Sequence, residues 1–227
     1  MIKKLTKIVW VVILSVTFSS ISFAQESSTI SRILENGELR VGTSGNQPPY
    51  TFVNKENKVV GYEMDLATAL SESIGVKLTV VQMPFNELLG ALEKGKIDVI
   101  MSGMTITPER NLKAAFVGPY MVSGKSIMTK TANLEKLDEE SEINQSQVTL
   151  VALEGSTSES FVKNFLPEAK LITTKDYDSA VKMVMDDKAS AMISDVEIIA
   201  VTMLRYPNSD LTALTTPLTI EPIGMAL

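Results

Sequence analysis

Strand-like and helix-like segments alternate along this chain, and this alternation constrains its fold more than any other feature of the sequence. A strand-like segment at 39–43 precedes a helix-like segment at 62–74, in which apolar residues recur on one face. Strand-like, helix-like and strand-like segments then follow at 78–82, 85–94 and 98–102. Alternation of this β–α–β kind is typical of a parallel sheet with helices packed against it.

The alternation starts again after an extended stretch at 121–130 and a polar, acidic segment at 131–147. Three strand-like segments then each precede a helix-like one: 148–153 with 156–165, 170–173 with 176–187, and 191–194 with 195–205. The pattern predicts an α/β protein of two lobes, each a mainly parallel sheet flanked by helices. We expect residues 25–125 plus 216–227 to form lobe I, and residues 126–215 to form lobe II.

The first 24 residues have the layout of a secretory signal peptide. Three lysines within the first seven residues form a basic start, an apolar run follows at 8–16, and the segment ends in Ser22-Phe23-Ala24. The apolar run is shorter than the about 20 residues that a membrane-spanning helix needs. We therefore expect cleavage after Ala24 and a periplasmic protein; the alternative is an uncleaved N-terminal anchor.

Composition excludes several functions. The chain has neither Cys nor His, so it can form no disulfide, no Cys/His zinc site, no thiolate nucleophile and no imidazole base. Removing the first 24 residues, which contain three lysines and no acid, leaves 18 basic and 27 acidic residues, a net charge of −9. Such a protein repels nucleic-acid phosphates, so no nucleic-acid partner is expected. No Gly-rich phosphate loop and no metal-ligand spacing occurs, so we expect neither a cofactor nor a metal.

Two predicted helices begin with residues that suit the binding of an anion. In the segment 102–110, Thr107 suits an N-cap and Arg110 offers a planar fork that matches a carboxylate. Further along, Ser156 and Glu159 have the spacing of a capping box at the start of a helix, where free N–H groups attract anions. Taken singly, the first segment is equally consistent with a surface turn and a solvated arginine, and the second with a well-capped helix.

A third such junction carries an acid, Asp195. This residue could cap its own helix or receive the ammonium group of a ligand. Together, Arg110 and free N–H groups would bind a carboxylate, while Asp195 and a carbonyl would bind an ammonium. Because these groups lie on both predicted lobes, the sequence predicts a receptor for a small zwitterion in the cleft between them.

At these positions the chain resembles the bacterial extracellular solute-binding proteins of family 3, the polar amino-acid binders of ABC importers. The resemblance covers nearly the whole chain after the signal peptide and rests on the order and spacing of short motifs. These are 39–43 with Pro48-Pro49-Tyr50, 61–66, Phe85, 101–110 with Phe116 and Pro119-Tyr120, 154–157, and Asp195. The resemblance implies a two-lobed periplasmic-binding-protein-like fold, an amino-acid-like ligand in the interlobe cleft, an ABC transporter permease as partner, and a monomer.

The resemblance also implies a role for individual residues. Phe85 would stack on the ligand side chain, and Arg110 would clamp the α-carboxylate with help from the N–H groups of Thr105 and Thr157. The Gly103 carbonyl, the Thr105 hydroxyl and the Asp195 carboxylate would hold the α-ammonium. The remaining expected ligand-binding residues are Ser44, Gln47, Ser102 and Ser156. Residues near 121–128 and 214–219 would form the two hinge strands.

Departures from the family bear on the ligand and on the chain's end. Ser44 stands where relatives that bind basic or amide side chains often carry an acid, and Gln47 stands where they often carry an aromatic residue. No charge for a ligand side chain is evident, so we expect a neutral ligand, unless Glu154 points into the cleft. The family normally continues past Leu227 with helices that complete lobe I, so either the chain is a fragment truncated at its C-terminus or lobe I lacks this cover.

Two other functions remain open on the same fold. Cyclohexadienyl dehydratases, which act on prephenate or arogenate, resemble these binders and need a proton donor in the cleft. The nearest candidates are Glu154 and Glu197, but Glu197 lies two residues beyond Asp195 and is expected to point elsewhere on its helix. We therefore favour a non-catalytic binding protein over the dehydratase, with a ligand-sensing module as a third possibility.

Overall fold

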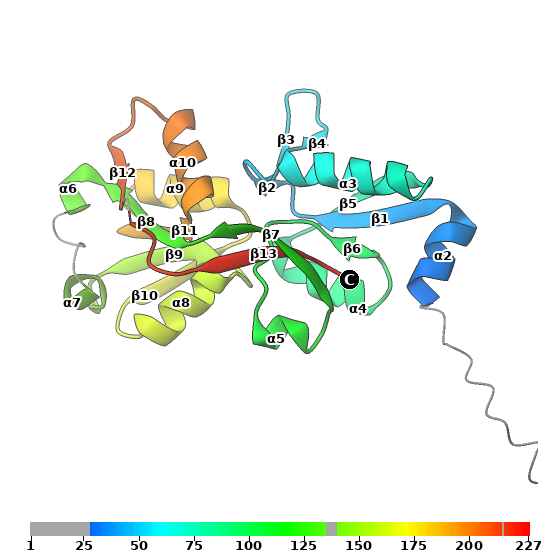
Figure 1. The fold of residues 1–227 in the computed structure, drawn as a ribbon. Helices are drawn as coiled ribbons and strands as arrows, with labels where there is room; N and C mark the ends of the chain where they lie inside the picture. Colours follow the sequence, from blue (N-terminus) through cyan, green and yellow to red (C-terminus); the bar gives the residue numbers. More distant parts are fainter. Residues whose placement is uncertain (1–27, 135–139, 215) are drawn as a thin grey trace, which may run out of the picture.

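The computed structural model describes residues 28–134, 140–214 and 216–227, so the signal peptide expected at 1–24 lies outside the described residues. Within these ranges, no helix has the length and apolar character that a membrane crossing requires. Two five-stranded sheets form two lobes, which lie side by side in Figure 1. The prediction of a two-lobed α/β fold is confirmed.

The sheet of lobe I has the strand order β5-β1-β6-β13-β7. Its strands are β1 (Glu38–Thr43), β5 (Lys77–Gln82), β6 (Val99–Ile100), β7 (Phe116–Ser123) and β13 (Glu221–Ala226). Strand β1 pairs in parallel with β5 and β6, whereas β13 runs antiparallel to β6 and β7. A small sheet of β2 (Asn46–Gln47), β3 (Thr51–Val53) and β4 (Val59–Val60) extends this lobe.

The sheet of lobe II repeats this arrangement in the order β10-β9-β11-β8-β12. Its strands are β8 (Lys125–Lys130), β9 (Thr149–Leu153), β10 (Lys170–Thr174), β11 (Ala191–Asp195) and β12 (Leu211–Ala213). Strand β9 pairs in parallel with β10 and β11, and β8 runs antiparallel to β11 and β12. In each sheet the first three strands of the order are therefore parallel, and the last two add antiparallel pairs.

Helices cover these sheets because alternate residues of each strand face opposite sides. The helices of lobe I are α2 (Ser28–Asn36), which the sequence pattern did not predict, α3 (Tyr62–Ser73), the 3₁₀ turn η1 (Phe85–Glu87), α4 (Leu88–Glu93) and α5 (Pro108–Asn111). Those of lobe II are α6 (Thr131–Leu134), α7 (Glu140–Ile143), α8 (Thr157–Phe165), α9 (Tyr177–Met185) and α10 (Val196–Arg205). Leu39 and Val41 of β1 pack with Met64 of α3, whereas a side chain at Gly42 would meet Leu88 of α4.

The chain passes between the lobes twice, and the two passages lie against each other. The first runs from β7 to β8 through Gly124, and the second leads from β12 to β13 and includes residues 216–220. A Cβ atom on Gly124 would lie 2.4 Å from the Thr219 carbonyl oxygen, so glycine is needed for this approach. The Leu218 N–H donates to the Lys125 carbonyl oxygen at 2.7 Å, which ties the two passages together.

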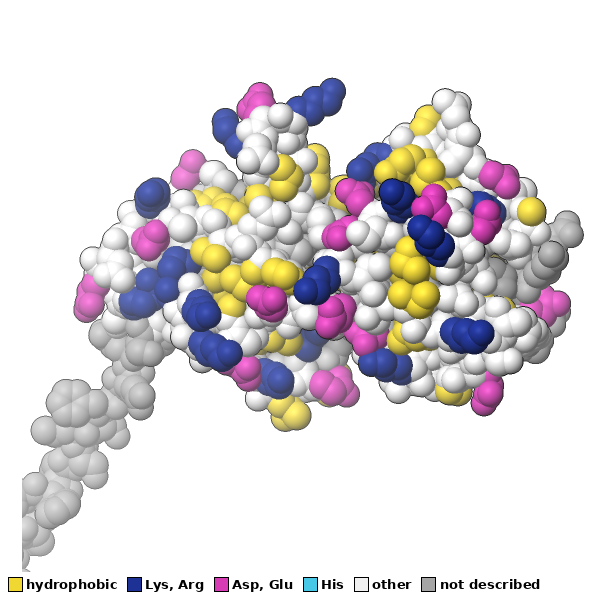
Figure 2. All heavy atoms as spheres, turned by 180° about the vertical axis from the view of Figure 1, so that it is seen from behind, with side chains coloured by type: hydrophobic (Ala, Val, Ile, Leu, Met, Phe, Trp, Pro, Cys, Tyr) yellow, Lys and Arg dark blue, Asp and Glu magenta, His cyan; other side chains and the backbone are white. Residues whose placement is uncertain are grey.

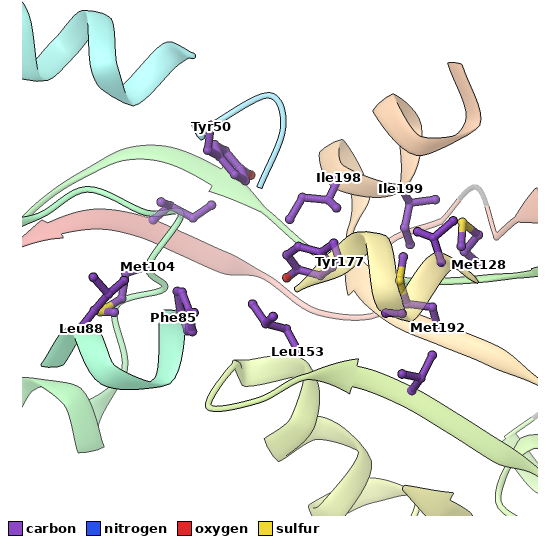
Figure 3. Packing of buried hydrophobic residues seen from close by; sticks show 14 of the residues in the cluster. Tyr50, Phe85, Leu88, Met104, Met128, Leu153, Tyr177, Met192, Ile198 and Ile199 are labelled. Carbon is purple, nitrogen blue, oxygen red and sulfur yellow. The ribbon is translucent and has the colours of Figure 1, made fainter. Parts of the chain in front are cut away.

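The largest apolar cluster extends across both lobes. It includes Tyr50 and Phe85 from lobe I and Leu153 and Tyr177 from lobe II, all of them buried. Figure 3 shows these four side chains directed toward the same space between the lobes. From behind, Figure 2 shows two masses joined at a waist, with acidic and basic side chains interspersed over both. Apolar side chains from both lobes therefore meet between the lobes, and the polar groups among them need specific partners.

Candidate functional site

Arg110 is the central charge of the site. Thr107 caps α5, as predicted: its hydroxyl accepts from the Arg110 N–H at 3.2 Å, and Pro108 takes the first helical position. The Arg110 side chain then reaches between the lobes and is only 8% exposed. Its Nη1 donates to the Thr105 carbonyl oxygen at 2.8 Å, and its Nη2 donates across to the Gly155 carbonyl oxygen of lobe II at 3.1 Å.

The buried guanidinium has neutral partners only. Among the residues that the structure describes, Arg110 forms no ion pair, and below it lies the Phe85 ring, with the Arg110 Cζ 5.6 Å from the ring centroid. Burial lowers the pKa of Arg110, while the more distant carboxyl groups of Glu221 and Asp195 oppose that change. Desolvating a guanidinium without a carboxylate partner is costly, so this position suits an anionic group.

The start of α8 faces Arg110 from lobe II. Ser156 caps this helix, since its Oγ accepts from the Glu159 N–H at 3.2 Å while donating to the Leu153 carbonyl oxygen at 2.7 Å. The expected capping box is displaced by one residue, because the Glu159 carboxylate accepts from the Gly155 N–H at 2.6 Å rather than from Ser156. The Ser156 hydroxyl is thus engaged within its own turn.

Thr157 is the residue of α8 that meets lobe I. Its Oγ1 lies 3.3 Å from Thr105 Oγ1 and donates to Glu221 Oε2 at 3.1 Å. The close approach of the lobes here depends on Gly155, whose φ is +75° and whose Cβ would lie 2.9 Å from the Asn86 Cβ. Arg110, Thr105 and Thr157, which the sequence placed on different lobes, therefore come together.

In this structure the Asp195 side chain neither caps its own helix nor is free to receive a ligand ammonium, because it pairs with Lys125. It is the N-cap residue of α10, but its side chain makes no cap hydrogen bond. Instead, its Oδ1 accepts from the Lys125 Nζ at 2.5 Å, and both side chains are almost fully buried. Burial raises the pKa of Asp195, and the charge and hydrogen bond of Lys125 lower it in opposition. The ammonium partner of Asp195 in this structure is thus a side chain of the protein itself.

Sequence reasoning missed Lys125 and Glu221. Lys125 lies directly opposite Asp195 in the antiparallel pair of β8 and β11, so their contact follows from the strand register. Glu221 begins β13, with its Oε2 3.6 Å from the Lys125 Nζ, and its Oε1 accepts from the Thr219 hydroxyl at 2.9 Å. The contacts of Lys125 with Asp195 and with Glu221 leave no signal in the local sequence, because the paired residues are far apart along the chain.

The prediction that Glu197 points away from the cleft is wrong. Its Oε2 accepts from the Tyr50 hydroxyl of lobe I at 3.0 Å and also from the hydroxyl of Ser123, the last residue of β7. The first turn of α10 begins where the lobes meet, so even a residue two positions beyond Asp195 reaches the other lobe. Burial, followed by the charges of Asp195 and Glu197, strongly raises the pKa of Tyr50, which keeps the phenol protonated as a donor.

Ser44, Gln47 and Ser102 form a separate buried cluster within lobe I. Ser102 Oγ donates to Gln47 Oε1 at 2.7 Å, and Ser44 Oγ lies 3.1 Å from the same oxygen. Tyr177 of lobe II approaches this cluster, and burial raises the pKa of its phenol while Gln47 acts in the opposite direction. Ser44, Gln47 and Ser102 are therefore hydrogen-bonded to one another within lobe I.

Gly103 has the φ of +60° that favours glycine, and its Cβ would lie 2.9 Å from the Tyr50 ring. Its N–H donates to both carboxylate oxygens of Glu63, at 2.8 and 2.9 Å, and Tyr120 donates a further hydrogen bond to Glu63. Glu63 is fully buried in the first turn of α3. This carboxyl group fixes the loop that carries Gly103 and Thr105, a role that the sequence did not indicate.

The junction of the lobes carries more charges than the sequence argument counted, and the expectation of a neutral ligand stays a prediction. Two cationic residues, Arg110 and Lys125, lie among three acidic ones, Asp195, Glu197 and Glu221. The sequence argument recognised only one of these acids as part of the site. Within the described residues, no group of acidic side chains has the arrangement of a metal site.

A sequence model of the bacterial extracellular solute-binding proteins, family 3, matches residues 39–206. The chain is similar to the cyclohexadienyl dehydratase of Pseudomonas aeruginosa, with 32% identity over 177 residues, which cover 78% of this chain and 66% of that protein. It is also similar to a probable histidine-binding protein of Campylobacter jejuni, with 31% identity over 159 residues, covering 69% and 59% of the two chains. The chain thus spans less than two thirds of either curated relative.

Among solved structures, the chain is similar to the ancestral amino acid-binding protein AncCDT-1, a precursor of cyclohexadienyl dehydratase. The TM-score is 0.81 at 36% sequence identity, and the match covers 88% of this chain and 86% of that one. A likeness at this level covers both lobes and the junction between them.

Proposed function

Because this chain belongs to family 3 of the bacterial extracellular solute-binding proteins, we propose that it captures a small amino acid or amino-acid-like solute and delivers it to an ABC importer. The observation that supports this most directly is Arg110, a guanidinium that is 8% exposed, lies between the lobes and is held only by carbonyl oxygens. Its remaining donors match the planar geometry of a carboxylate, which an amino acid supplies.

The neighbouring residues suit the rest of such a solute. Phe85 lies beneath the guanidinium and would carry the solute's side chain, as aromatic rings do in small-molecule sites. Thr105 and Thr157 flank the carboxylate position from opposite lobes, so a bound carboxylate would hold the lobes together. The two passages, at Gly124 and at 216–220, would act as the hinge between the two lobes.

Location and partners follow from the family. An extracellular solute-binding protein of this kind works in the periplasm, which agrees with the secretory signal expected at residues 1–24. Its macromolecular partner would be the permease of an ABC transporter, and the protein itself would act as a monomer without cofactor or catalysis.

The test is a thermal-shift screen of the protein against the twenty amino acids, followed by calorimetry on each hit. A ligand at 100 times its dissociation constant adds about 2.7 kcal/mol to the unfolding free energy. Arg110→Ala should abolish the response. The matched control is Arg205→Ala, because Arg205 also lies over an aromatic ring, Tyr206, but pairs with Asp178 on the surface. A folded protein that responds to none of the compounds would overturn the proposal.

A second candidate function is the elimination of water from a cyclic acid, as by the cyclohexadienyl dehydratase to which the chain is similar. The observation that favours it is Glu197, a carboxyl group at the junction of the lobes with Tyr50 and Ser123 as donors. A carboxyl group in this position is a candidate for general acid–base chemistry. Turnover of prephenate or arogenate that is lost in Glu197→Gln would establish the enzyme, whereas binding without turnover would exclude it.

A further inference from the structure

A buried lysine, Lys125, occupies the position at which the proposed function requires a ligand ammonium. It is 1% exposed, and its Nζ lies 2.5 Å from Asp195 Oδ1. The antiparallel register places the two residues directly opposite each other on β8 and β11, so the backbone brings this pair together. Asp195 is therefore already neutralised by the protein, although the sequence motif assigns it to the ammonium group of an amino acid.

The same ammonium has a second carboxylate within reach. Glu221 Oε2 lies 3.6 Å from the Lys125 Nζ, too far for a hydrogen bond but close enough for an ion pair. Glu221 comes from β13, the strand that receives the second passage, whereas Asp195 belongs to lobe II. Hydroxyl groups of Thr157 and Thr219 hold the Glu221 carboxylate in place at 3.1 and 2.9 Å. One buried cation thus lies between two fixed acceptors.

We propose that Lys125 is an internal competitor for the ammonium position and sets the specificity of the site. When an amino acid binds, its α-ammonium takes Asp195, and the Lys125 ammonium moves to Glu221. The inference rests on the proposed function, because it assumes that Arg110 binds the carboxylate of the same solute. Since a buried charge needs a partner, the exchange requires both carboxylates, and Glu221 is the acceptor that permits it.

Two consequences distinguish this exchange from an ordinary ammonium site. First, Lys125 weakens the binding of every amino acid, because each must displace it. Second, Lys125 reduces the preference for an amino acid over the same molecule without its α-amino group, since the latter leaves the Lys125–Asp195 pair intact. A merely structural lysine would affect both kinds of ligand equally.

The experiment measures calorimetric affinities for three matched pairs of compounds. These are L-arginine with 5-guanidinopentanoate, L-phenylalanine with 3-phenylpropanoate, and L-glutamine with 4-carbamoylbutanoate. Lys125→Met should tighten the binding of whichever amino acid binds by about tenfold, the equivalent of one favourable contact of 1.4 kcal/mol, without tightening its des-amino partner. Lys130→Met is the control, because Lys130 lies on the same strand but pairs with Asp187 at the periphery.

A thermodynamic cycle tests the second acceptor. Glu221→Gln should weaken amino-acid binding in the otherwise unchanged protein and have a smaller effect in the Lys125→Met background, where no lysine needs to be received. If Lys125→Met does not fold, Lys125→Gln, which retains a donor toward Asp195 without the charge, takes its place in the cycle.

Each outcome bears on one claim. Equal changes for both members of a pair, weaker amino-acid binding in Lys125→Met, or additive effects in the cycle would overturn the exchange while leaving the solute-binding function intact. Failure of these six compounds and of all twenty amino acids of the thermal-shift screen to bind either protein would instead overturn the carboxylate site at Arg110, and the exchange with it.

Discussion

The buried carboxyl group of Glu63 makes a sharp prediction about pH. Glu63 is fully buried, and its partners are the Gly103 N–H and the Tyr120 hydroxyl. Burial raises the pKa of Glu63 from 4.5 to about 7, and the hydrogen bonds from Tyr120 and Gly103 limit that rise. The folded protein therefore holds a proton that the unfolded chain releases at lower pH.

The sign and size of the effect follow from proton linkage. Between pH 4.5 and about pH 7 the folded state binds more protons than the unfolded state, so stability falls as the pH rises through this window. Below pH 4.5 the carboxyl group is neutral in both states, and no penalty applies. A shift of about 2.5 units, at 1.36 kcal/mol each, lowers the free energy of unfolding by about 3 kcal/mol above pH 7.

Glu63→Gln should remove this penalty, because the amide is neutral at every pH and its oxygen can still accept from Gly103. Urea unfolding at intervals from pH 4 to pH 8.5 measures the free energy of unfolding of both proteins. We expect the variant to match the original protein near pH 4 and to exceed it by up to about 3 kcal/mol at pH 8. Glu72→Gln, on the exposed side of the same helix, is the control and should leave the pH dependence unchanged. Parallel curves for the original protein and Glu63→Gln across this window would refute the reasoning.

Three further substitutions test other contacts. Asp98, which is 2% exposed and bridges two arginines, has its pKa lowered by them despite the opposing effect of burial. Asp98→Asn should reduce the free energy of unfolding at pH 7 by about 2 kcal/mol in urea titrations. The difference should begin to shrink as the pH falls below 3.8 and be lost as the pH falls through the lower pKa of Asp98 in the folded protein; a constant difference would contradict this. Tyr50→Phe removes the hydroxyl that donates to Glu197 across the lobes. It should lower the free energy of unfolding by about 1 kcal/mol and enlarge the radius of gyration in X-ray scattering. An unchanged radius would show that the contact does not hold the lobes together. Gly124→Ala places a Cβ 2.4 Å from the Thr219 carbonyl oxygen. It should lower the free energy of unfolding by about 1–3 kcal/mol, measured by thermal unfolding. Unaltered stability would mean that the two passages can move apart to make room for the Cβ.

Local sequence signals predicted the features that depend on neighbouring residues. The alternation of strands and helices predicted two α/β lobes, and the caps at Thr107 and Ser156 are present because a cap involves residues only three positions apart. The short helix α2 was missed although its nine residues are amphipathic, because it precedes the first strand and so lies outside the alternation that was followed. Glu159 shows the limit of such signals: its spacing indicated a capping box, but its carboxylate bonds one residue earlier than expected.

The rest of the site depends on register and on the meeting of the lobes, which no local pattern encodes. Lys125 and Asp195 are 70 residues apart and meet only because β8 and β11 pair with these residues opposite each other. Tyr50 and Glu197 are 147 residues apart and meet only when the lobes come together. Helical periodicity predicted that Glu197 points elsewhere than Asp195, but the Glu197 carboxylate reaches the Tyr50 hydroxyl of lobe I.

The location of Lys125 and Glu221 connects the site to the hinge. Lys125 begins β8 directly after the first passage, and Glu221 begins β13 directly after the second, so both charges are attached to the segments that join the lobes. The backbone of Lys125 is itself bound to the second passage, through Thr219 Oγ1 at 3.0 Å and the Leu218 N–H at 2.7 Å. Under the proposed exchange, a change of partner by the Lys125 ammonium would therefore act on the segments that join the lobes. Arg110 alone would let a carboxylate hold the lobes together, whereas the proposed exchange at Lys125, Asp195 and Glu221 would also let the ammonium of a solute act on the segments that join the lobes.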